Sequence, residues 1–274
     1  MNTPEFKPLT VIVRGAGDLA TGIIYRLWKC GFRVLATEIA RPLAVRRAVS
    51  AASAVYDGEA LIEDMPVRLV GSASEFLAAD CPCVIVDPNG ETIALLRPEI
   101  VMDAIMAKRN TGTNKSMAPL VIAIGPGFSA PGEVHAVVES KRGHRLGRLI
   151  VNGSAIPDTG VPGSVGGYTT ERLLRAPASG SVISPFVIGD KVKAGMEVAE
   201  VDGVKIRARI DGVLRGLIHP DAPVTAGMKI GDIDPSGDPE RCFTITDKAL
   251  AVAGGALEAI MSLGIRAGRF NKYR

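Results

Sequence analysis

The sequence is poor in aromatic residues, cysteine and histidine. Aromatic residues make up 4% of its 274 residues, and it holds four cysteines and three histidines. Four scattered cysteines are too few for a disulfide framework and suit a reducing compartment. Three isolated histidines cannot be assembled into a histidine-rich metal site from the sequence alone, so we predict no metal site.

Net charge and long apolar runs are also scarce. The chain carries 32 Lys and Arg against 29 Asp and Glu, a net charge of +3, which does not by itself predict nucleic-acid binding. No window offers about 18 uninterrupted apolar residues, as a membrane span requires. The N-terminal segment lacks the basic and apolar regions of a secretory signal. We therefore expect a soluble, cytoplasmic protein that binds neither nucleic acid nor a membrane.

The residue in excess is glycine. The chain holds 31 glycines and 18 prolines, without a triplet period or a low-complexity tract. These residues must therefore lie at individual turns and close backbone approaches. At roughly 150 residues per domain, the length suggests about two domains.

The first part of the chain alternates short apolar runs with helical patterns. The run at 9–14 ends in GAGDLATG, apolar residues at helical spacing follow as far as Gly31, and a second β-rich run ends at Glu38. A further helix is expected over residues 42–50, and the alternation continues to LVIAIGPG at 120–127. Strands that alternate with helices imply a parallel sheet. We predict an α/β fold with a Rossmann-like, doubly wound parallel sheet over residues 1–168, which would form a nucleotide-binding domain.

After about residue 165, glycines separate short β-like runs at nearly regular intervals. Residues 191–202 align with 223–234 at an offset of 32, and the same offset maps Gly180 onto Gly212. Two such units resemble the barrel-sandwich hybrid fold of biotinyl and lipoyl carrier domains. We predict this smaller β domain, with a C-terminal helix, over residues 169–274.

The strongest candidate site is the glycine turn between the first strand and helix. Gly15 permits the tight turn, Gly17 lets the backbone approach a diphosphate, and the helix N-terminus offers N–H groups to anionic oxygens. Glu38, 21 residues beyond Gly17, is placed to accept ribose hydroxyls. Asp18 would repel a phosphate unless it meets a ribose, a metal or an arginine, and Arg14 precedes the turn. The alternative is a turn that keeps this geometry without the ligand.

Further candidates lie in two loops after predicted strands and in the basic run KRGHRLGR at 141–148. Ligands of open α/β sheets bind beyond the carboxyl ends of strands, and guanidinium groups bind phosphate or carboxylate oxygens in pairs. These candidate cofactor ligands are Asn110, Thr113, Gly125, Gly127, Arg142 and His144. Ordinary solvated loops are the alternative for each. The arginines that follow Glu38, among them Arg46, are expected to be exposed to solvent.

Several long blocks together carry a family resemblance, among them GAGDLATGIIYRLWKCGFRVLATE, VMDAIMAKRNTGT and DKALAVAGGALEAI. The chain resembles the YqeB-like accessory proteins of selenium-dependent molybdenum hydroxylase systems. Its first half is similar to the nucleotide-binding part of XdhC-type maturation factors. The resemblance implies a cytoplasmic factor that helps to modify or insert a molybdenum cofactor. A molybdopterin dinucleotide could use Gly15, Gly17 and Glu38, and the implied partners are a molybdenum hydroxylase apoenzyme or other cofactor-maturation proteins.

Two other functions stay open. The same glycine turn suits an NAD(P)-dependent oxidoreductase, and the β domain would let a non-catalytic adaptor dock a partner enzyme. The sequence has no GxSxG, HExxH or P-loop motif. Whether the chain is an enzyme, and whether it forms a homo-oligomer, is therefore left open.

Overall fold

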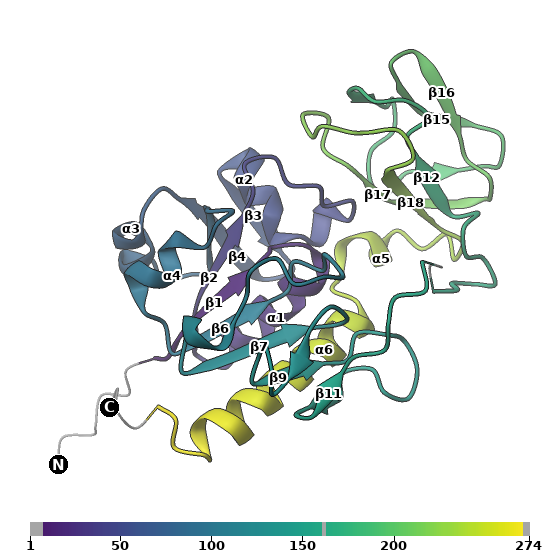
Figure 1. The fold of residues 1–274 in the computed structure, drawn as a ribbon. Coiled ribbons are helices and arrows are strands. Elements are labelled where there is room, and N and C mark those ends of the chain that lie inside the picture. The colour runs from purple at the N-terminus through teal and green to yellow at the C-terminus, as the bar shows by residue number, and fades with distance from the viewer. Residues whose placement is uncertain (1–7, 161–162, 271–274) are drawn as a thin grey trace.

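The computed structural model describes residues 8–160 and 163–270, and its largest feature is a nine-stranded sheet (Figure 1). From one edge to the other, its strands are β10 (Leu149–Ile150), β9 (Ala136–Val138), β7 (Leu120–Ile124), β6 (Ile100–Asp103), β1 (Thr10–Arg14), β2 (Arg33–Glu38), β5 (Cys83–Val86), β4 (Met65–Val70) and β3 (Glu59–Ile62). The strands from β9 to β4 run parallel. The carboxyl ends of β1, β2, β6 and β7 therefore lie along one edge.

The predicted doubly wound parallel sheet of the Rossmann-like type is wrong, because the sheet is mixed. β3 pairs antiparallel with β4, and β10 pairs antiparallel with β9. Only Glu63 and Asp64 join β3 to β4, and so short a connection can only return the chain antiparallel. The helix predicted over residues 42–50 is also wrong, since that segment is a loop with the 3-10 turn η1 (Arg47–Val49).

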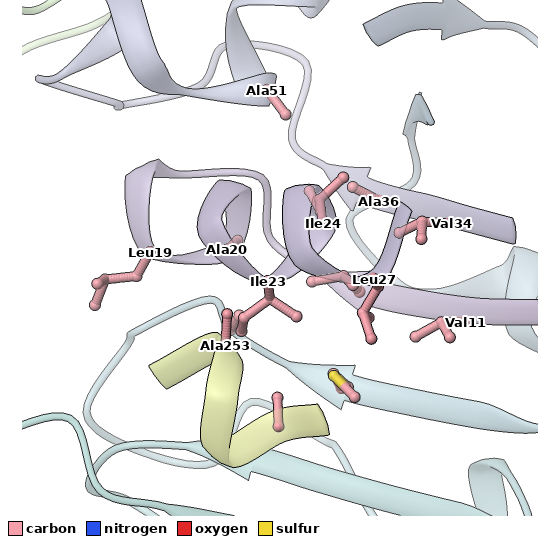
Figure 2. Close-up of a cluster of buried hydrophobic side chains, with 14 of the residues drawn as sticks. Val11, Leu19, Ala20, Ile23, Ile24, Leu27, Val34, Ala36, Ala51 and Ala253 are labelled. Atoms are coloured by element: carbon pink, nitrogen blue, oxygen red, sulfur yellow. The ribbon is translucent and has the colours of Figure 1, made fainter. Parts of the chain in front are cut away.

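Two long helices, the first and the last of six α-helices in the described residues, cover one face of the sheet. The six are α1 (Asp18–Lys29), α2 (Ala54–Asp57), α3 (Ala73–Ala78), α4 (Glu91–Leu96), α5 (Glu240–Phe243) and α6 (Asp247–Ala259), which continues into the π-helical turn η4 (Ile260–Ile265). α1 packs on α6 in a core that buries Ile23, Leu27 and Ala253 (Figure 2). Neighbouring strand residues point to opposite faces, so Ile12 joins a second core around Phe76.

Residues 172–234, here called the β module, form two small antiparallel sheets. One has the order β12 (Leu173–Arg175), β18 (Lys229–Asp234), β17 (Gly212–Leu217) and β14 (Lys191–Val192), and the other has the order β13 (Val182–Ile183), β15 (Glu197–Val201) and β16 (Val204–Arg207). The predicted barrel-sandwich hybrid is wrong as a description, because register shifts interrupt these short strands and they form separate sheets. A further pair, β8 (Ser129–Ala130) with β11 (Gly153–Ser154), lies outside the module.

The repeat in the sequence is visible in the pairing within the β module. Gly180 and Val224 bridge through mutual backbone hydrogen bonds of 3.1 and 3.3 Å, while Gly212 pairs with Val192. Gly212 and Val224 are the repeat mates of Gly180 and Val192 at the offset of 32 residues. Each unit of the repeat therefore pairs its glycine with the valine of the other unit.

The C-terminal helix packs on the large sheet and not on the β module. Ala249, Val252 and Ala256 of α6 are buried in the same core as α1, so residues 8–160 and α6 are together called the sheet region. By length and composition alone, Glu240–Ile265 would suit a membrane span: its most apolar window has a mean hydropathy of 1.5, and 44% of that window is buried inside the protein. One such helix is weak evidence for a membrane span. The boundary at residue 168 and the cytoplasmic location stay predictions.

The β module lies directly against the loop that follows β2. Arg47 Nε donates to the Leu217 carbonyl at 3.0 Å, and the ring of Tyr56 stacks on His219 with centroids 3.8 Å apart. The chain enters and leaves the module at adjacent points, because the Ile233 N–H donates to the Arg172 carbonyl at 2.8 Å. The module is thus an insertion between the large sheet and α6 (Figure 1).

Candidate functional site

The turn between β1 and α1 leaves the helix N-terminus open. Gly15 has a φ of 92°, and a Cβ on it would lie 2.9 Å from the Cα of Ile105, just beyond β6. Gly17 precedes the helix with a φ of −68°, and a Cβ there would meet nothing within 4 Å. The first N–H groups of a helix have no partner inside it, so those of α1 are available to an acceptor in this open space.

A cavity of about 350 Å³, here called the first cavity, lies at this turn between the end of β2 and residues 104–106. Glu38 is part of its wall, and its carboxylate accepts the N–H groups of Ala16 at 3.0 Å and Ile39 at 2.8 Å. Burial raises the pKa of Glu38, although both hydrogen bonds oppose the shift. Glu38 therefore holds the turn, and each of its oxygens keeps a lone pair for a further donor.

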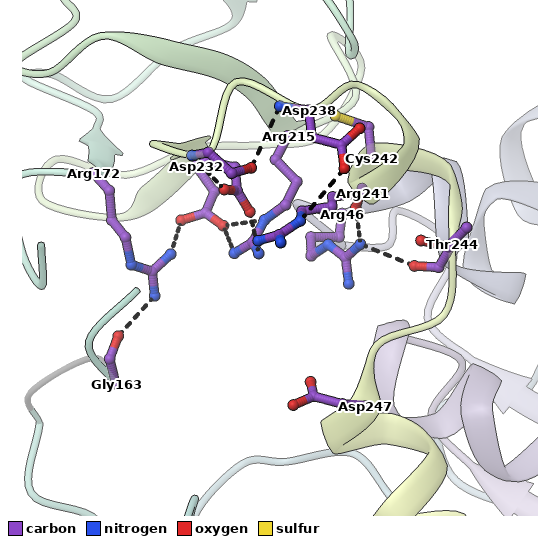
Figure 3. A network of polar contacts seen from close by, with 12 residues as sticks. Arg46, Gly163, Arg172, Arg215, Asp232, Asp238, Arg241, Cys242, Thr244 and Asp247 are labelled. Carbon is purple, nitrogen blue, oxygen red and sulfur yellow. Dashed lines mark hydrogen bonds and ion pairs between the residues drawn. The ribbon is translucent and has the colours of Figure 1, made fainter. Parts of the chain in front are cut away.

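Arg46 also lines the first cavity, and the prediction that it is exposed is wrong. Its exposure is 7%, and its Nη2 donates to the carbonyls of Arg241 at 2.9 Å and Thr244 at 3.3 Å (Figure 3). Its Nε and Nη1 are buried without a hydrogen-bond partner, and Asp18, at 3.7 Å from Nη1, is within ion-pair distance only. Burial lowers the pKa of Arg46, which Asp18 partly offsets. Two donors of this guanidinium are therefore buried without an acceptor in a residue that lines the first cavity.

A second cavity, of about 500 Å³, adjoins the first and lies between the sheet region and the β module. Both cavities are lined by Asp18, Val45, Arg46 and Met106, so they share a wall. The cations that line the second cavity are Arg46, Lys108, Lys141, Arg142, Arg172, Arg215, Lys229 and Lys248. Only three carboxylates line it, so the second cavity is positively charged.

A buried ion-pair network from the β module forms one side of the second cavity (Figure 3). Asp232, with 0% exposure, accepts hydrogen bonds from Arg172 and from Arg215, the latter at 2.9 Å to Nε. Arg215 also donates to Asp234 at 3.0 Å. Burial alone would lower the pKa of Arg215, but the two carboxylates outweigh burial and raise it. Arg215 therefore stays charged, and the hydrogen bonds to Asp232 fix both arginines in position.

Two lysines reach the same cavity from different elements. Lys229 stands at the start of β18, 3.7 Å from Asp232, and Lys248 stands in the first turn of α6. Burial lowers the pKa of both lysines, and the carboxylates of Asp232 and Asp18 oppose the shift for Lys229 and Lys248 respectively. An anion bound between them would favour their charged forms.

The structure brings five of the predicted site residues together. Gly15, Gly17, Asp18 and Glu38 line the first cavity, and Asp18 and Arg142 line the second. Asp18 lies beside Arg46, so an arginine accounts for the carboxylate that seemed out of place at a phosphate turn.

Arg14 and Thr113 meet away from both cavities. Arg14, with 3% exposure, donates to the Thr113 hydroxyl, and that hydroxyl donates to Asp103 at 2.5 Å. Both residues line neither cavity, and they join the ends of β1 and β6 to the loop that follows β6. Their role in this arrangement is to fix the loop.

The other predicted residues have local roles in loops. The Asn110 side chain accepts the Thr113 N–H at 2.9 Å, which closes its loop. A Cβ on Gly125 would lie 2.5 Å from Ser140 Oγ, and one on Gly127 would lie 2.6 Å from the Arg109 nitrogen. These glycines thus permit close packing of loops and line neither the first nor the second cavity.

In the basic run at 141–148, some residues fit the predicted anion site and others fit the alternative of an ordinary loop. Arg142 forms a bidentate pair with Asp247 at 2.9 and 3.1 Å at the rim of the second cavity. His144 is exposed and lines neither cavity. The run therefore contributes Lys141 and Arg142 to the second cavity and leaves His144, Arg145 and Arg148 exposed, while Leu146 packs on the core that contains α6.

Sequence reasoning missed Arg172, Arg215, Lys229 and Lys248, which lie 126 or more residues beyond Arg46 in the chain. The only local signal was a charge inside an apolar strand, as for Arg215 in GVLRGL. A charged residue in a buried strand indicates a partner, but it does not say where that partner lies. Within residues 8–160 and 163–270, no three His, Cys, Asp or Glu side chains are grouped to hold a metal ion.

Comparison with known proteins gives one clear relative. No family model matches the chain. It is 44% identical over 257 residues to the uncharacterized protein YqeB of Escherichia coli (strain K12). The matched region covers 92% of this chain and 47% of that protein. Solved structures match weakly: an aspartoacylase family protein from Mesorhizobium loti (11% identity, 83% of this chain and 85% of that chain, TM-score 0.26) and a succinylglutamate desuccinylase/aspartoacylase from Rhodobacter sphaeroides (14%, 83%, 85%, TM-score 0.25). Such TM-scores carry no conclusion. The chain is thus similar to YqeB over nearly all of its own length and spans about half the length of that relative.

Proposed function

We propose that the chain binds a nucleotide-containing cofactor through a phosphate group held in the first cavity. The observation that carries this proposal is the buried guanidinium of Arg46, whose Nε and Nη1 have no hydrogen-bond partner. A charged donor buried without an acceptor is costly, and a phosphate supplies acceptors that match a guanidinium. The open N-terminus of α1 on the same cavity adds backbone donors for the same phosphate.

The two adjoining cavities support a ligand larger than a mononucleotide. The first has a volume of about 350 Å³ and the second of about 500 Å³, and they share the wall formed by Asp18 and Arg46. A dinucleotide has a diphosphate between two bulky ends, so it would extend from one cavity toward the other. Glu38, on the wall of the first cavity, is available to accept ribose hydroxyls.

We further propose that this cofactor is a molybdopterin dinucleotide, and that the chain prepares or inserts it in a selenium-dependent molybdenum hydroxylase. This part rests on the family resemblance, and the hydroxylase apoenzyme is the proposed partner. The residues fit such a group, because its diphosphate suits Arg46 and the α1 N-terminus. Gly17 leaves the space that a close approach of the diphosphate needs. NAD(P) presents the same diphosphate and ribose and is the competing ligand.

The test is to identify what the protein binds. Native mass spectrometry of the purified full chain is expected to show a retained nucleotide-containing ligand. Calorimetric titration should give tighter binding of a molybdopterin dinucleotide than of NAD or NADP. Tight binding of NAD alone would favour the oxidoreductase alternative and reject the molybdenum assignment, and failure to bind any of the three would reject the proposal.

Two variants locate the binding site. Gly17→Leu is expected to fold, because a Cβ there meets nothing and φ is −68°, but its side chain would occupy the first cavity and lower the affinity for the dinucleotide about tenfold or more. Gly195 also has open space around a Cβ, but its φ of 88° would strain a leucine, so Gly195→Leu is not a suitable control. Gly254→Leu is the matched control, since it adds the same side chain in open space on α6. Equal affinities of both variants and the unmodified protein would place the ligand elsewhere.

A further inference from the structure

We infer that the second cavity is an anion subsite in its own right, which takes a second phosphate or a carboxylate of the ligand held in the first cavity. The inference rests on the proposed function and adds a property of the ligand. The ligand carries two separate anionic groups, and it contacts both the sheet region and the β module.

The carboxylates of the second cavity are already engaged by cations. Asp232 is hydrogen-bonded by Arg172 and Arg215 and lies 3.7 Å from Lys229 Nζ. Asp158 lies 2.7 Å from Lys108 Nζ. Arg215 also pairs with the buried Asp234, so two buried carboxylates face three cations and one positive charge is left over. A partly buried excess of one charge favours binding of the opposite charge.

Arg172, which lines the second cavity, has one side-chain donor without an acceptor. Its exposure is 7%, its Nη1 donates to Asp232, and its Nη2 donates to the Gly163 carbonyl at 3.3 Å (Figure 3). Its Nε is buried and has no hydrogen-bond partner. An oxyanion in the second cavity, which Arg172 lines, would supply the missing acceptor.

Lys248 gives a second and independent reason. A lysine in the first turn of a helix faces the positive end of the helix dipole, which disfavours it. Lys248 occupies that position in the 13-residue helix α6, lines the second cavity and has a pKa lowered by burial. An anion in the cavity would offset both effects. Lys248 belongs to the sheet region and Arg172 to the β module, so an anion in this cavity would lie between the two parts of the molecule.

The anion is distinct from the phosphate proposed for the first cavity. Gly15, Gly17 and Glu38 line only the first cavity, whereas Arg172 and Lys248 line only the second. Arg46 stands between them and lines both. A ligand that fills both cavities therefore passes Arg46 and ends in a phosphate or a carboxylate beside Arg172.

Inorganic phosphate is a probe that does not depend on knowing the ligand. Calorimetry on the full chain is expected to detect two phosphate sites. Lys248→Gln should weaken one site about tenfold, the loss expected for one charge-assisted hydrogen bond, and leave the other unchanged. Gly17→Leu should instead remove the phosphate site in the first cavity and leave the site at Lys248 unchanged. Lys193→Gln makes the same charge change at an exposed residue that lines neither cavity and should alter neither site.

The outcomes separate the two proposals. If Gly17→Leu removes a site and Lys248→Gln changes nothing, the second subsite is wrong and the proposed function stands. If only Lys248→Gln weakens binding, the second subsite stands and the nucleotide proposal is wrong. A single phosphate site that Lys248→Gln does not weaken, or the absence of any phosphate site, overturns the inference. Malonate in place of phosphate identifies the group: competition at the Lys248 site indicates a carboxylate, and its absence a phosphate. Thermal unfolding of each variant shows that it is folded.

Discussion

At the scale of single residues, two glycines of the same turn are expected to respond differently to alanine. Gly15 has a φ of 92° and a Cβ would press on Ile105 at 2.9 Å, so Gly15→Ala should lower the free energy of unfolding by about 1–3 kcal/mol. Gly17 has open space and a φ of −68°, so Gly17→Ala should change it by less than about 0.5 kcal/mol. Urea unfolding at equilibrium measures both, and equal losses would contradict this account of the turn.

Asp87 gives a prediction about pH. Its carboxylate accepts the N–H groups of Gly90, Glu91 and Thr92 at 2.8, 2.9 and 2.8 Å, at the start of α4. Burial alone would raise the pKa of Asp87, but these hydrogen bonds and the Thr92 hydroxyl lower it. A carboxylate whose pKa is lowered in the folded state stabilises that state at pH values above its ordinary pKa of 3.8. This stabilisation is lost as the pH falls through the lowered pKa.

Asp87→Asn should therefore cost about 1.5–3 kcal/mol of unfolding free energy at pH 7, since it removes a charged acceptor. The difference from the unmodified protein should shrink as the pH falls below the ordinary pKa of aspartate. Urea titrations at a series of pH values test this. A cost that stays constant down to the lowest pH would show that the charge of Asp87 does not contribute.

The sequence predicts those site residues that are neighbours in the chain. Gly15, Gly17 and Asp18 form one turn, and Glu38 ends the next strand, so local pattern places them together. The sequence predicts that Arg46 is exposed to solvent, because its burial depends on carbonyls at Arg241 and Thr244 that local pattern cannot locate. Residues of the second cavity come from segments far apart, and only the packing of the β module brings them together.

At the scale of elements, two adjacent glycines of α6 should have opposite effects. A Cβ on Gly255 would lie 2.1 Å from the Gly147 carbonyl oxygen, so Gly255→Ala must push the helix off its neighbouring loop, at a cost of about 1–3 kcal/mol. A Cβ on Gly254 would meet nothing within 4 Å, so Gly254→Ala should gain up to about 1 kcal/mol from helix propensity. Thermal unfolding of the two variants should shift in opposite directions, and a shared direction would contradict the packing described for α6.

The order of strands and helices could be predicted only in part. The pattern from β1 through α1 to β2 was clear, because apolar periodicity changes from strand to helix spacing at a glycine turn. The hairpin of β3 and β4 was missed, since Glu63 and Asp64 lack the usual glycine of a two-residue turn. Without that reversal the sequence predicts a parallel sheet, whereas antiparallel pairing at both edges, β3 with β4 and β10 with β9, makes the sheet mixed.

At the scale of the molecule, α6 makes the sheet region depend on the end of the chain. Residues 1–170 alone would expose the face of α1 that buries Ile23 and Leu27 against α6. This fragment should therefore aggregate or lack a cooperative unfolding transition. Excision of residues 173–232 with a short Gly–Ser linker should instead leave a folded protein, because Arg172 and Ile233 are hydrogen-bonded neighbours. Circular dichroism and size-exclusion chromatography distinguish the two.

Cooperative unfolding of residues 1–170 alone would show that α6 is dispensable and would contradict this prediction. If the excised protein is folded, it should also keep a phosphate site that is sensitive to Gly17→Leu and lack the site that is sensitive to Lys248→Gln. That separation would assign each subsite to its part of the molecule.

The adjacent entry and exit of the β module have a consequence for how such proteins diversify. An inserted segment whose two ends meet can be exchanged as a unit, since the connectivity of the surrounding fold does not change. Here the exchanged unit carries Arg172, Arg215 and Lys229, while Gly17 and Glu38 stay with the sheet. One recombination event would thus replace the part of the proposed ligand site that the β module supplies and keep the proposed phosphate site at the α1 N-terminus.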